Sequence, residues 1–293
     1  MAEIYASGGL QKMQTTLNTT LNSQSTSNAA DKISLVNYQL PVGEQVIAMN
    51  PLLGKTIKMV YSGAIFCQHC HRKTKTSFNQ GYCYPCFKKL AQCDSCIMSP
   101  EKCHYFEGTC REPEWGEKFC MQDHYVYLAN SSGVKVGITR GSQIPTRWMD
   151  QGAIQALPIF RVSNRLQSGQ VEVMFKEHVA DKTNWRKMLK GEVETIDLLA
   201  KRDELVANCT AQITDLQAQF GLQAIKYLDD AEPIDIHYPV VQHPVKVTSM
   251  NFDKQPVIEG VLKGIKGQYL MLDCGVINMR KFSAYHIDFS VVE

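Results

Sequence analysis

Nine of the eleven cysteines in this chain lie between Cys67 and Cys120, and this clustering constrains the fold more than any other feature. Three pairs share C-x2-C spacing: Cys67 with Cys70, Cys83 with Cys86, and Cys93 with Cys96. Two intervening residues allow both sulfurs to reach one ion, at about 2.3 Å from a tetrahedral Zn²⁺. The spacing therefore predicts that this segment binds metal.

The first two pairs predict one complete zinc site. Twelve residues, among them Gly81, separate Cys70 from Cys83, which closely matches a four-cysteine zinc ribbon or treble-clef knuckle. The predicted ligands are Cys67, Cys70, Cys83 and Cys86. The remaining cysteines predict a second zinc site, with Cys93, Cys96, Cys103 and Cys110 as the preferred ligands. Cys120, His104 and His124 are alternative ligands for that site.

The surroundings of the cysteines favour metal over a disulfide framework. The opening residues, MAEIYASGG, contain neither a basic region nor an apolar core of a signal peptide. No apolar run approaches the roughly 20 residues that cross a bilayer. We therefore expect a cytoplasmic protein with no membrane partner, in which clustered thiols bind metal or react rather than crosslink.

The charge pattern points to a polyanionic partner. The formal net charge is only +2, but residues 135–190 contain ten basic and four acidic side chains. A basic central segment in a nearly neutral chain favours a nucleic acid, DNA or RNA, as the partner. A solvated basic face is the alternative interpretation.

The changes in composition along the chain predict an α+β protein with several parts. The predicted parts, in chain order, are a flexible, low-complexity N-terminus (1–32), a β-rich lead-in (33–64), a cysteine-rich zinc module resembling a zinc ribbon (65–124), a small α/β core (125–192), a long amphipathic helix (193–230) and a small C-terminal β-barrel of SH3 or OB type (231–293).

The predicted core begins with a hairpin, whose strands are 125–129 and 134–139, and continues with a helix carrying Arg147. A strand (154–162) and a second helix with Val171 and Phe175 facing inward follow. This region resembles the GIY-YIG nuclease superfamily. Tyr125-Val126-Tyr127 stands in the place of the GIY motif, and Lys135-Val136-Gly137 follows ten residues later in the place of YIG.

The resemblance implies catalytic roles for particular residues. Arg147 matches the helix-borne arginine of the family, Glu172 its metal-binding glutamate, and Asn184 an asparagine found in some members. With Tyr127 and Lys135 these residues form the candidate catalytic set. Tyr127 would position the attacking water, Arg147 would stabilise the charged phosphorus, and Glu172 would hold Mg²⁺ or Mn²⁺.

The chain departs from the GIY-YIG pattern at two places. Lys135 replaces the tyrosine of the second motif, and the first motif lacks its leading glycine. A lysine can act as a base or only bind phosphate. The sequence therefore leaves open whether the chain is an endonuclease of this type.

Several longer strings are similar to an uncharacterised bacterial family, a domain of unknown function (number 2797). These strings are GYCYPCF, GTCREPEWGE, VYLANSS, KVGIT and PTRWMDQGA. The resemblance covers most of the chain beyond the low-complexity segment, and it implies an architecture rather than an activity.

The first functional hypothesis is a zinc-containing protein that binds nucleic acid, with or without metal-dependent phosphodiester cleavage. The alternative is a non-catalytic regulatory module that is stabilised by zinc and binds nucleic acid or another protein. A third interpretation is a redox or zinc sensor built on the cysteine block, from which mild oxidant would release zinc reversibly.

Overall fold

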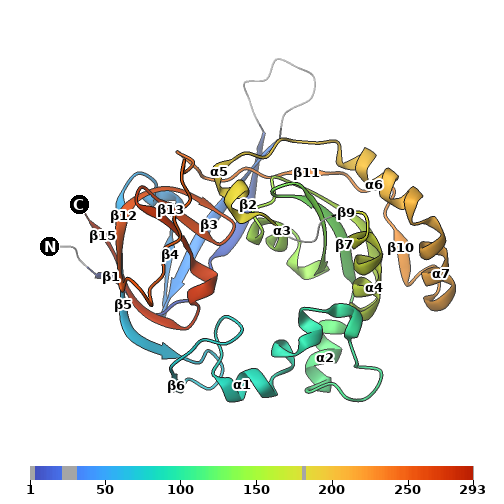
Figure 1. Cartoon of the computed structure of the whole chain (residues 1–293), viewed down its shortest axis with the longest axis horizontal. Helices are drawn as coiled ribbons and strands as arrows, with labels where there is room; N and C mark the ends of the chain where they lie inside the picture. Colours follow the sequence, from blue (N-terminus) through green and yellow to red (C-terminus); the bar gives the residue numbers. More distant parts are fainter. Residues whose placement is uncertain (1–3, 22–31, 180–182, 293) are drawn as a thin grey trace.

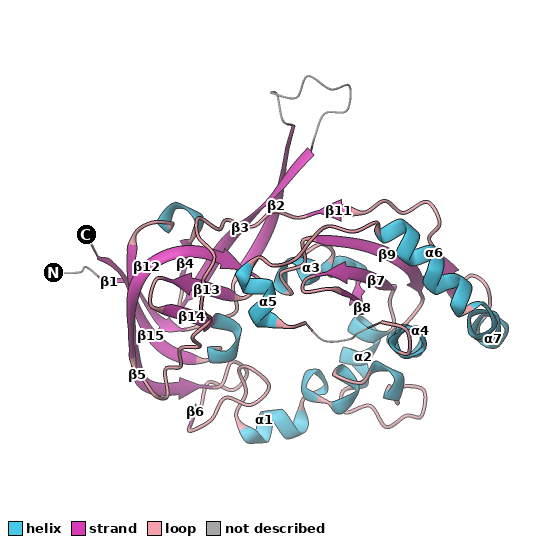
Figure 2. Cartoon of the chain, turned by 45° about the horizontal axis from the view of Figure 1, so that its top comes forward, coloured by secondary structure: helices cyan, strands magenta, loops and turns pink. Residues whose placement is uncertain are grey.

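The computed structural model describes residues 4–21, 32–179 and 183–292. Within those ranges the chain forms three antiparallel sheets with helices around them (Figures 1 and 2). The cysteine-rich segment, with α1 (Tyr84–Lys89) and α2 (Pro113–Cys120), links the largest sheet to the second one. The chain is therefore a mixed α/β protein with the cysteine-rich segment between its two main sheets.

The largest sheet joins strands from both ends of the chain. In sheet order its strands are β1 (Ile4–Gly9), β15 (Tyr285–Val292), β5 (Thr56–Phe66), β12 (Val257–Lys266), β13 (Tyr269–Leu272) and β14 (Gly275–Asn278), and β6 (Lys73–Thr74) pairs with β5. Ile57 and Met59 on β5 face the core, in register with Val291 and Phe289 of β15. These residues share one face of the sheet because every second side chain of a strand points to the same side.

The predicted C-terminal barrel of residues 231–293 is wrong, because this sheet is open, with β1 and β14 at its ends. The physical reason is β5, an eleven-residue strand from the lead-in. It pairs with β15 on one side and with β12 on the other. The C-terminal strands therefore continue a sheet centred on β5 and do not close on themselves.

The second sheet contains the predicted hairpin. Its strands, in order, are β10 (Ile225–Tyr227), β9 (Gln155–Val162), β7 (His124–Asn130) and β8 (Val134–Arg140), and β11 (Ile234–Asp235) also pairs with β9. The hairpin and the strand after it are confirmed. The sheet extends beyond the predicted end of the core at residue 192, because β10 and β11 come from later in the chain.

The third sheet and the helices complete the fold. The strands are β2 (Gln14–Leu21), β3 (Lys32–Val42) and β4 (Gln45–Ala48). The remaining α-helices are α3 (Thr146–Asp150), α4 (Arg165–Lys176), α5 (Trp185–Lys190), α6 (Leu198–Asn208) and α7 (Thr210–Phe220). Short 3₁₀ turns are η1 (Asn50–Leu52), η2 (Ala91–Cys93), η3 (Ser95–Ile97), η4 (Pro100–Lys102), η5 (Gly141–Gln143) and η6 (Met279–Phe282).

Successive side chains of β7 point to opposite faces of the second sheet and so contribute to two separate hydrophobic cores. Val126 and Leu128 pack with α4, α6 and α7 on one face of the second sheet. Tyr127 and Ala129 point to the other face, where they join α3 and the core of the largest sheet. The predicted inward residues of α4, Val171 and Phe175, are confirmed. Tyr127 consequently lies between the two main sheets.

Two further predictions differ from the structure. The N-terminal segment predicted as flexible forms β1 and β2 over residues 4–21, because its backbone pairs with β15 and β3, while residues 22–31 lie outside the described residues. The single long helix is two helices that break at Cys209, whose φ is −110° and ψ is 13°. Thr210 and Asn208 at this break are weak helix formers.

Candidate functional site

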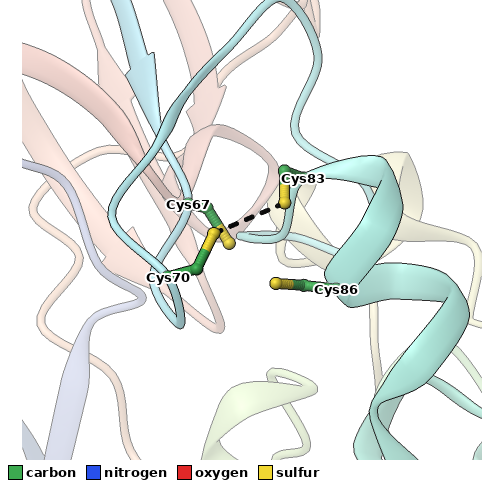
Figure 3. A group of neighbouring side chains, drawn as sticks. All are labelled: Cys67, Cys70, Cys83 and Cys86. Carbon is green, nitrogen blue, oxygen red and sulfur yellow. Dashed lines mark hydrogen bonds between the residues drawn. The ribbon is translucent and has the colours of Figure 1, made fainter.

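Four cysteine sulfurs converge between the end of β5 and the start of α1 (Figure 3). The sulfurs of Cys67, Cys70, Cys83 and Cys86 all lie within 4.8 Å of one another, and the Sγ atoms of Cys70 and Cys83 are 3.6 Å apart. Tetrahedral Zn²⁺ with bonds of about 2.3 Å places its sulfurs about 3.8 Å apart. These four residues, which we call the first cysteine cluster, therefore fit one structural zinc ion.

The backbone around the first cysteine cluster is folded to bring the sulfurs together. The Cys67 amide donates to the Arg72 carbonyl at 3.0 Å, and the His71 amide donates to the Cys67 carbonyl at 2.9 Å. Gly81, with φ +148°, is in a conformation that disfavours a side chain, and its carbonyl accepts a hydrogen bond from the Gln68 amide. This glycine therefore joins the two C-x2-C turns.

The electrostatics of the first cysteine cluster lower the pKa of the Cys67 and Cys70 thiols, whereas burial and the neighbouring sulfurs raise the pKa of the Cys86 thiol. Burial alone would raise the pKa of the Cys67 thiol, but hydrogen bonds from the backbone at Cys70, Cys83 and His69 lower that pKa to about 6. The Arg72 guanidinium hydrogen-bonds to Cys70, which raises the pKa of Arg72. Four thiolates around Zn²⁺ leave two negative charges, and Arg72 offsets part of them.

The later cysteines do not group as predicted. Cys93 packs against the first cysteine cluster, beside Cys83 and Cys86. The other three predicted ligands, Cys96, Cys103 and Cys110, line a separate cavity of about 10 Å³ together with Cys120. Of the alternative ligands, His104 also lines this cavity, whereas His124 does not line it and is buried with its Nδ1 2.7 Å from the Gln122 carbonyl oxygen.

Three of the five candidate catalytic residues interact electrostatically. Tyr127 on β7 is fully buried; burial raises the pKa of its phenol, while Arg147 on α3 lowers it and Glu172 on α4 raises it. Its hydroxyl accepts a hydrogen bond from the Gln151 side chain. The Glu172 carboxylate lies 3.2 Å from the Lys176 ammonium. The described fold thus gathers Tyr127, Arg147 and Glu172 with Tyr127 enclosed.

Lys135 and Asn184 form a second group near the start of α5. The Lys135 ammonium donates to the Thr183 hydroxyl at 2.6 Å. The Asn184 side chain accepts from the Lys187 amide at 3.2 Å and so caps α5. The Asn184 amide in turn donates to the Ser132 hydroxyl at 2.8 Å. These contacts give both residues a structural role in docking α5 to the hairpin.

Gly137 is the residue that makes room for Tyr127. The two residues are opposite each other in the hairpin, and a Cβ at Gly137 would lie 2.7 Å from the Tyr127 hydroxyl. We expect Gly137→Ala to lower the free energy of unfolding by about 2 kcal/mol, because the buried phenol must move. Gly9→Ala is the control, since a Cβ there meets nothing within 4 Å. Equal urea midpoints for the two variants would contradict this role.

A groove lies beside Cys67 of the first cysteine cluster. It consists of a cavity of about 480 Å³ and a cavity of about 640 Å³, which share Gln11, Gln68 and Tyr82. The smaller cavity is lined in addition by three cationic side chains, and the larger one by aromatic rings and imidazoles. The cations are Lys12, Arg147 and Arg280, and the rings belong to Phe66, His71 and His286. We call these two cavities the basic groove.

Most residues of the basic groove could not be recognised in the sequence. Lys12, Phe66 and Arg280 belong to the largest sheet and its connections, whereas Arg147 belongs to the core. Only Arg147 stands in a motif, and no spacing rule links it to the others. The pairing of β1, β5 and β15 brings the segments of the largest sheet together, and α3 joins them by packing on the core of that sheet.

A family model described as a protein of unknown function, DUF2797, matches residues 54–287. Searches of curated proteins and of solved structures found no match. Over the described residues, every helix is too short or too polar to span a membrane.

Proposed function

We propose that this chain, which belongs to the DUF2797 family of proteins of unknown function, is a zinc-stabilised protein that binds single-stranded nucleic acid in the basic groove. One observation carries the proposal. Arg147 and Arg280 line the same cavity, and among the described residues neither forms an ion pair with a carboxylate. Burial, and after it the neighbouring Arg147 cation, lower the pKa of Arg280, and the Asp150 carboxylate opposes this shift only in part.

Two arginines that line one cavity without a direct ion pair favour an anionic ligand, because the Asp150 and Glu172 carboxylates near them offset only part of their charge. Like charges in a partly buried site repel each other, and a bound anion removes that repulsion. A guanidinium matches a phosphate because its planar donors make paired hydrogen bonds. Lys12 contributes less to the positive charge of the cavity, because its ammonium lies 2.8 Å from the Asp150 carboxylate.

The adjoining cavity supports a strand of nucleotides rather than a free phosphate. Phe66 is 39% exposed and packs edge-on against the His286 ring, with 5.9 Å between the two ring centroids. Proteins that bind single-stranded nucleic acids combine exposed rings with nearby cations: the bases stack on the rings, and the cations neutralise the phosphates. The arrangement favours extended strands over duplexes, because stacking on protein rings requires bases that are not already paired.

The proposal is tested by fluorescence anisotropy with zinc-loaded protein and labelled single-stranded DNA and RNA, with a duplex of the same sequence as the control. We expect single strands to bind more tightly than the duplex. The logarithm of the binding constant should fall with the logarithm of salt concentration with a slope of roughly −1.4 to −2, as two or three phosphate contacts require. Binding that does not depend on salt, or no binding, would contradict the proposal.

Metal-dependent cleavage of the bound strand is the second candidate function. It is favoured by the electrostatic coupling of Tyr127, Arg147 and Glu172, which are three of the five residues that the GIY-YIG resemblance identifies as the catalytic set. Glu172 would bind Mg²⁺ or Mn²⁺ through its oxygens, and Arg147 would stabilise the phosphorane. Glu172→Ala should abolish cleavage and leave zinc content unchanged. Cleavage that persists in this variant would exclude the assignment.

Glu172 should also affect stability in a pH-dependent way. Burial raises the pKa of Glu172, and the nearby Lys176 opposes this shift only in part. A carboxyl whose pKa is raised in the folded state loses stabilisation as the pH rises above the unfolded value, about 4.3. We therefore expect Glu172→Gln to be more stable than wild type at pH 7, with a smaller difference at pH 4. A difference that is the same at both pH values in urea unfolding would contradict this.

A further inference from the structure

Three side chains of different chemistry converge in the segment that follows the first cysteine cluster. The Asp94 carboxylate, the Cys96 thiol and the His104 imidazole each offer one atom, and these atoms all lie within 4.8 Å of one another. Asp94 caps η3, which carries Cys96, and His104 comes shortly after η4, so two short 3₁₀ turns position the group. Carboxylate oxygen, thiolate sulfur and imidazole nitrogen are the three kinds of protein ligand that bind Zn²⁺.

The hydrogen bonds of His104 leave a lone pair on its Nε2 atom. The Thr109 hydroxyl donates its single proton to the His104 carbonyl at 3.3 Å. The same hydroxyl lies 2.7 Å from His104 Nδ1, where it can only accept, so Nδ1 carries the ring proton. In a neutral imidazole the other nitrogen is then unprotonated. This tautomer, with Nδ1 engaged, is the one that binds a metal ion through Nε2.

The Nε2 lone pair faces a second acceptor. Asp94 Oδ2 lies 3.4 Å from His104 Nε2, which is longer than an ordinary hydrogen bond and sets two lone pairs against each other. Around a tetrahedral Zn²⁺ with bonds of about 2.1 Å, a nitrogen and an oxygen ligand lie about 3.4 Å apart. A divalent cation bound to both atoms would turn this unfavourable contact into two bonds.

The other contacts of Asp94 orient its carboxylate. Oδ1 accepts from the Ser95 amide at 2.6 Å and from the Ser95 hydroxyl at 3.2 Å. Oδ2 lies 2.8 Å from Nε of Arg111. A carboxylate oxygen has two lone pairs, so Oδ2 can accept from Arg111 and still bind an ion. Hydrogen bonds of this kind commonly hold a ligating carboxylate in place beside its metal.

We propose that Asp94, Cys96 and His104 bind a second zinc ion through Oδ2, Sγ and Nε2, with a water molecule as the fourth ligand. The three residues line a cavity of about 10 Å³, which is roughly the room that a single water molecule requires. The ion takes the place of the Cys96 thiol proton, which is released to solvent. One thiolate and one carboxylate then balance the charge of Zn²⁺. This second zinc site does not depend on nucleic-acid binding.

Neighbouring thiols line the same cavity without being ligands. Cys110 is half-buried, and its thiol donates to the Glu112 carbonyl at 3.6 Å. Cys103 shares a hydrogen bond with the Cys96 thiol, and its sulfur is not among the three atoms that converge. Cys103 therefore contacts a ligand of the ion rather than the ion itself.

The second zinc site supports the start of α4. Arg165, the first residue of α4, donates to the Cys96 carbonyl at 3.2 Å and to the Ile97 carbonyl at 2.6 Å. An ion bound by Cys96 fixes the turn to which Arg165 is attached. The His104 side chain is 24% exposed, and the site has only one sulfur ligand. We therefore expect a chelator to remove this ion before it removes the ion of the first cysteine cluster.

The test compares His104→Asn with Cys110→Ser after equilibrium dialysis against a fixed concentration of free Zn²⁺. The asparagine amide can still donate to Thr109 but lacks a counterpart of Nε2. By elemental analysis we expect two zinc ions per chain in wild type and in Cys110→Ser, and one in His104→Asn. In cadmium-substituted wild type, ¹¹³Cd NMR should show one resonance in the range of four-sulfur coordination and one at the lower frequency of a site with a single sulfur.

Four results would overturn the proposal. They are two zinc ions in His104→Asn, the loss of an ion in Cys110→Ser, a second resonance in the four-sulfur range, and a four-sulfur resonance alone in wild type. The last result would mean that His104 is an imidazolium paired with Asp94. If His104→Asn fails to fold, the wild-type spectrum still decides, because it counts the sites and distinguishes their sulfur content without any variant.

Discussion

Cys86→Ser should remove the zinc ion from the first cysteine cluster and lower the free energy of unfolding by about 4 kcal/mol or more. Cys86 is buried in α1, and its sulfur is one of four that point to a common centre (Figure 3). Serine offers a hard oxygen in place of a thiolate, and the remaining three thiolates repel one another without a full ligand set. The loss of metal should therefore unfold residues 67–93 locally.

Cys274→Ser is the matched control for this prediction. Cys274 is an exposed cysteine that belongs neither to the first cysteine cluster nor to the cavity lined by Cys96 and Cys103. Zinc content by elemental analysis and thermal unfolding by circular dichroism would be measured on wild type and both variants. Full zinc content in Cys86→Ser, or the same loss of stability in Cys274→Ser, would show that the first cysteine cluster is not a structural metal site.

Arg147→Glu should weaken the binding of single-stranded nucleic acid by about 30- to 150-fold. The change removes one charge-assisted contact to phosphate and introduces a repulsion, which together correspond to roughly 2–3 kcal/mol. The effect should be large because Arg147 shares its cavity with Arg280, so that the glutamate would also pair with the second cation of the groove. The salt dependence of binding should become shallower in the variant.

Lys226→Glu provides the control for net charge. Lys226 is exposed on β10 and lines neither cavity of the basic groove. The same change in total charge at this position should alter affinity by less than about threefold, because exposed charges beyond a Debye length are screened. Equal losses of affinity in the two variants would mean that binding follows overall charge rather than the basic groove.

Local sequence patterns predicted the first cysteine cluster and the hairpin of the core correctly. The C-x2-C turns fix the direction of two sulfurs within four residues, so spacing alone is informative there. The hairpin is similarly local, with a short turn between two alternating strands. Both features need few contacts from distant residues, which is why they are visible in the sequence.

The remaining features depend on long-range pairing. Cys120 joins Cys96 and Cys103 only because α2 folds back over its preceding loop, and no standard spacing marks this. The open sheet depends on β5 lying between β12 and β15, strands about 200 residues later in the chain. The polar N-terminal segment forms strands because partners for its backbone come from elsewhere.

Hydrogen exchange measured by mass spectrometry, with and without a saturating single-stranded oligonucleotide, tests the central claim most directly. We expect slower exchange in the peptides that cover residues 66–82 and 279–286, because these segments line the basic groove. Peptides from α6 and α7, on the outer face of the second sheet, should exchange at unchanged rates. Protection confined to segments outside the groove, or no protection anywhere, would contradict the assignment of the groove as a nucleic-acid site.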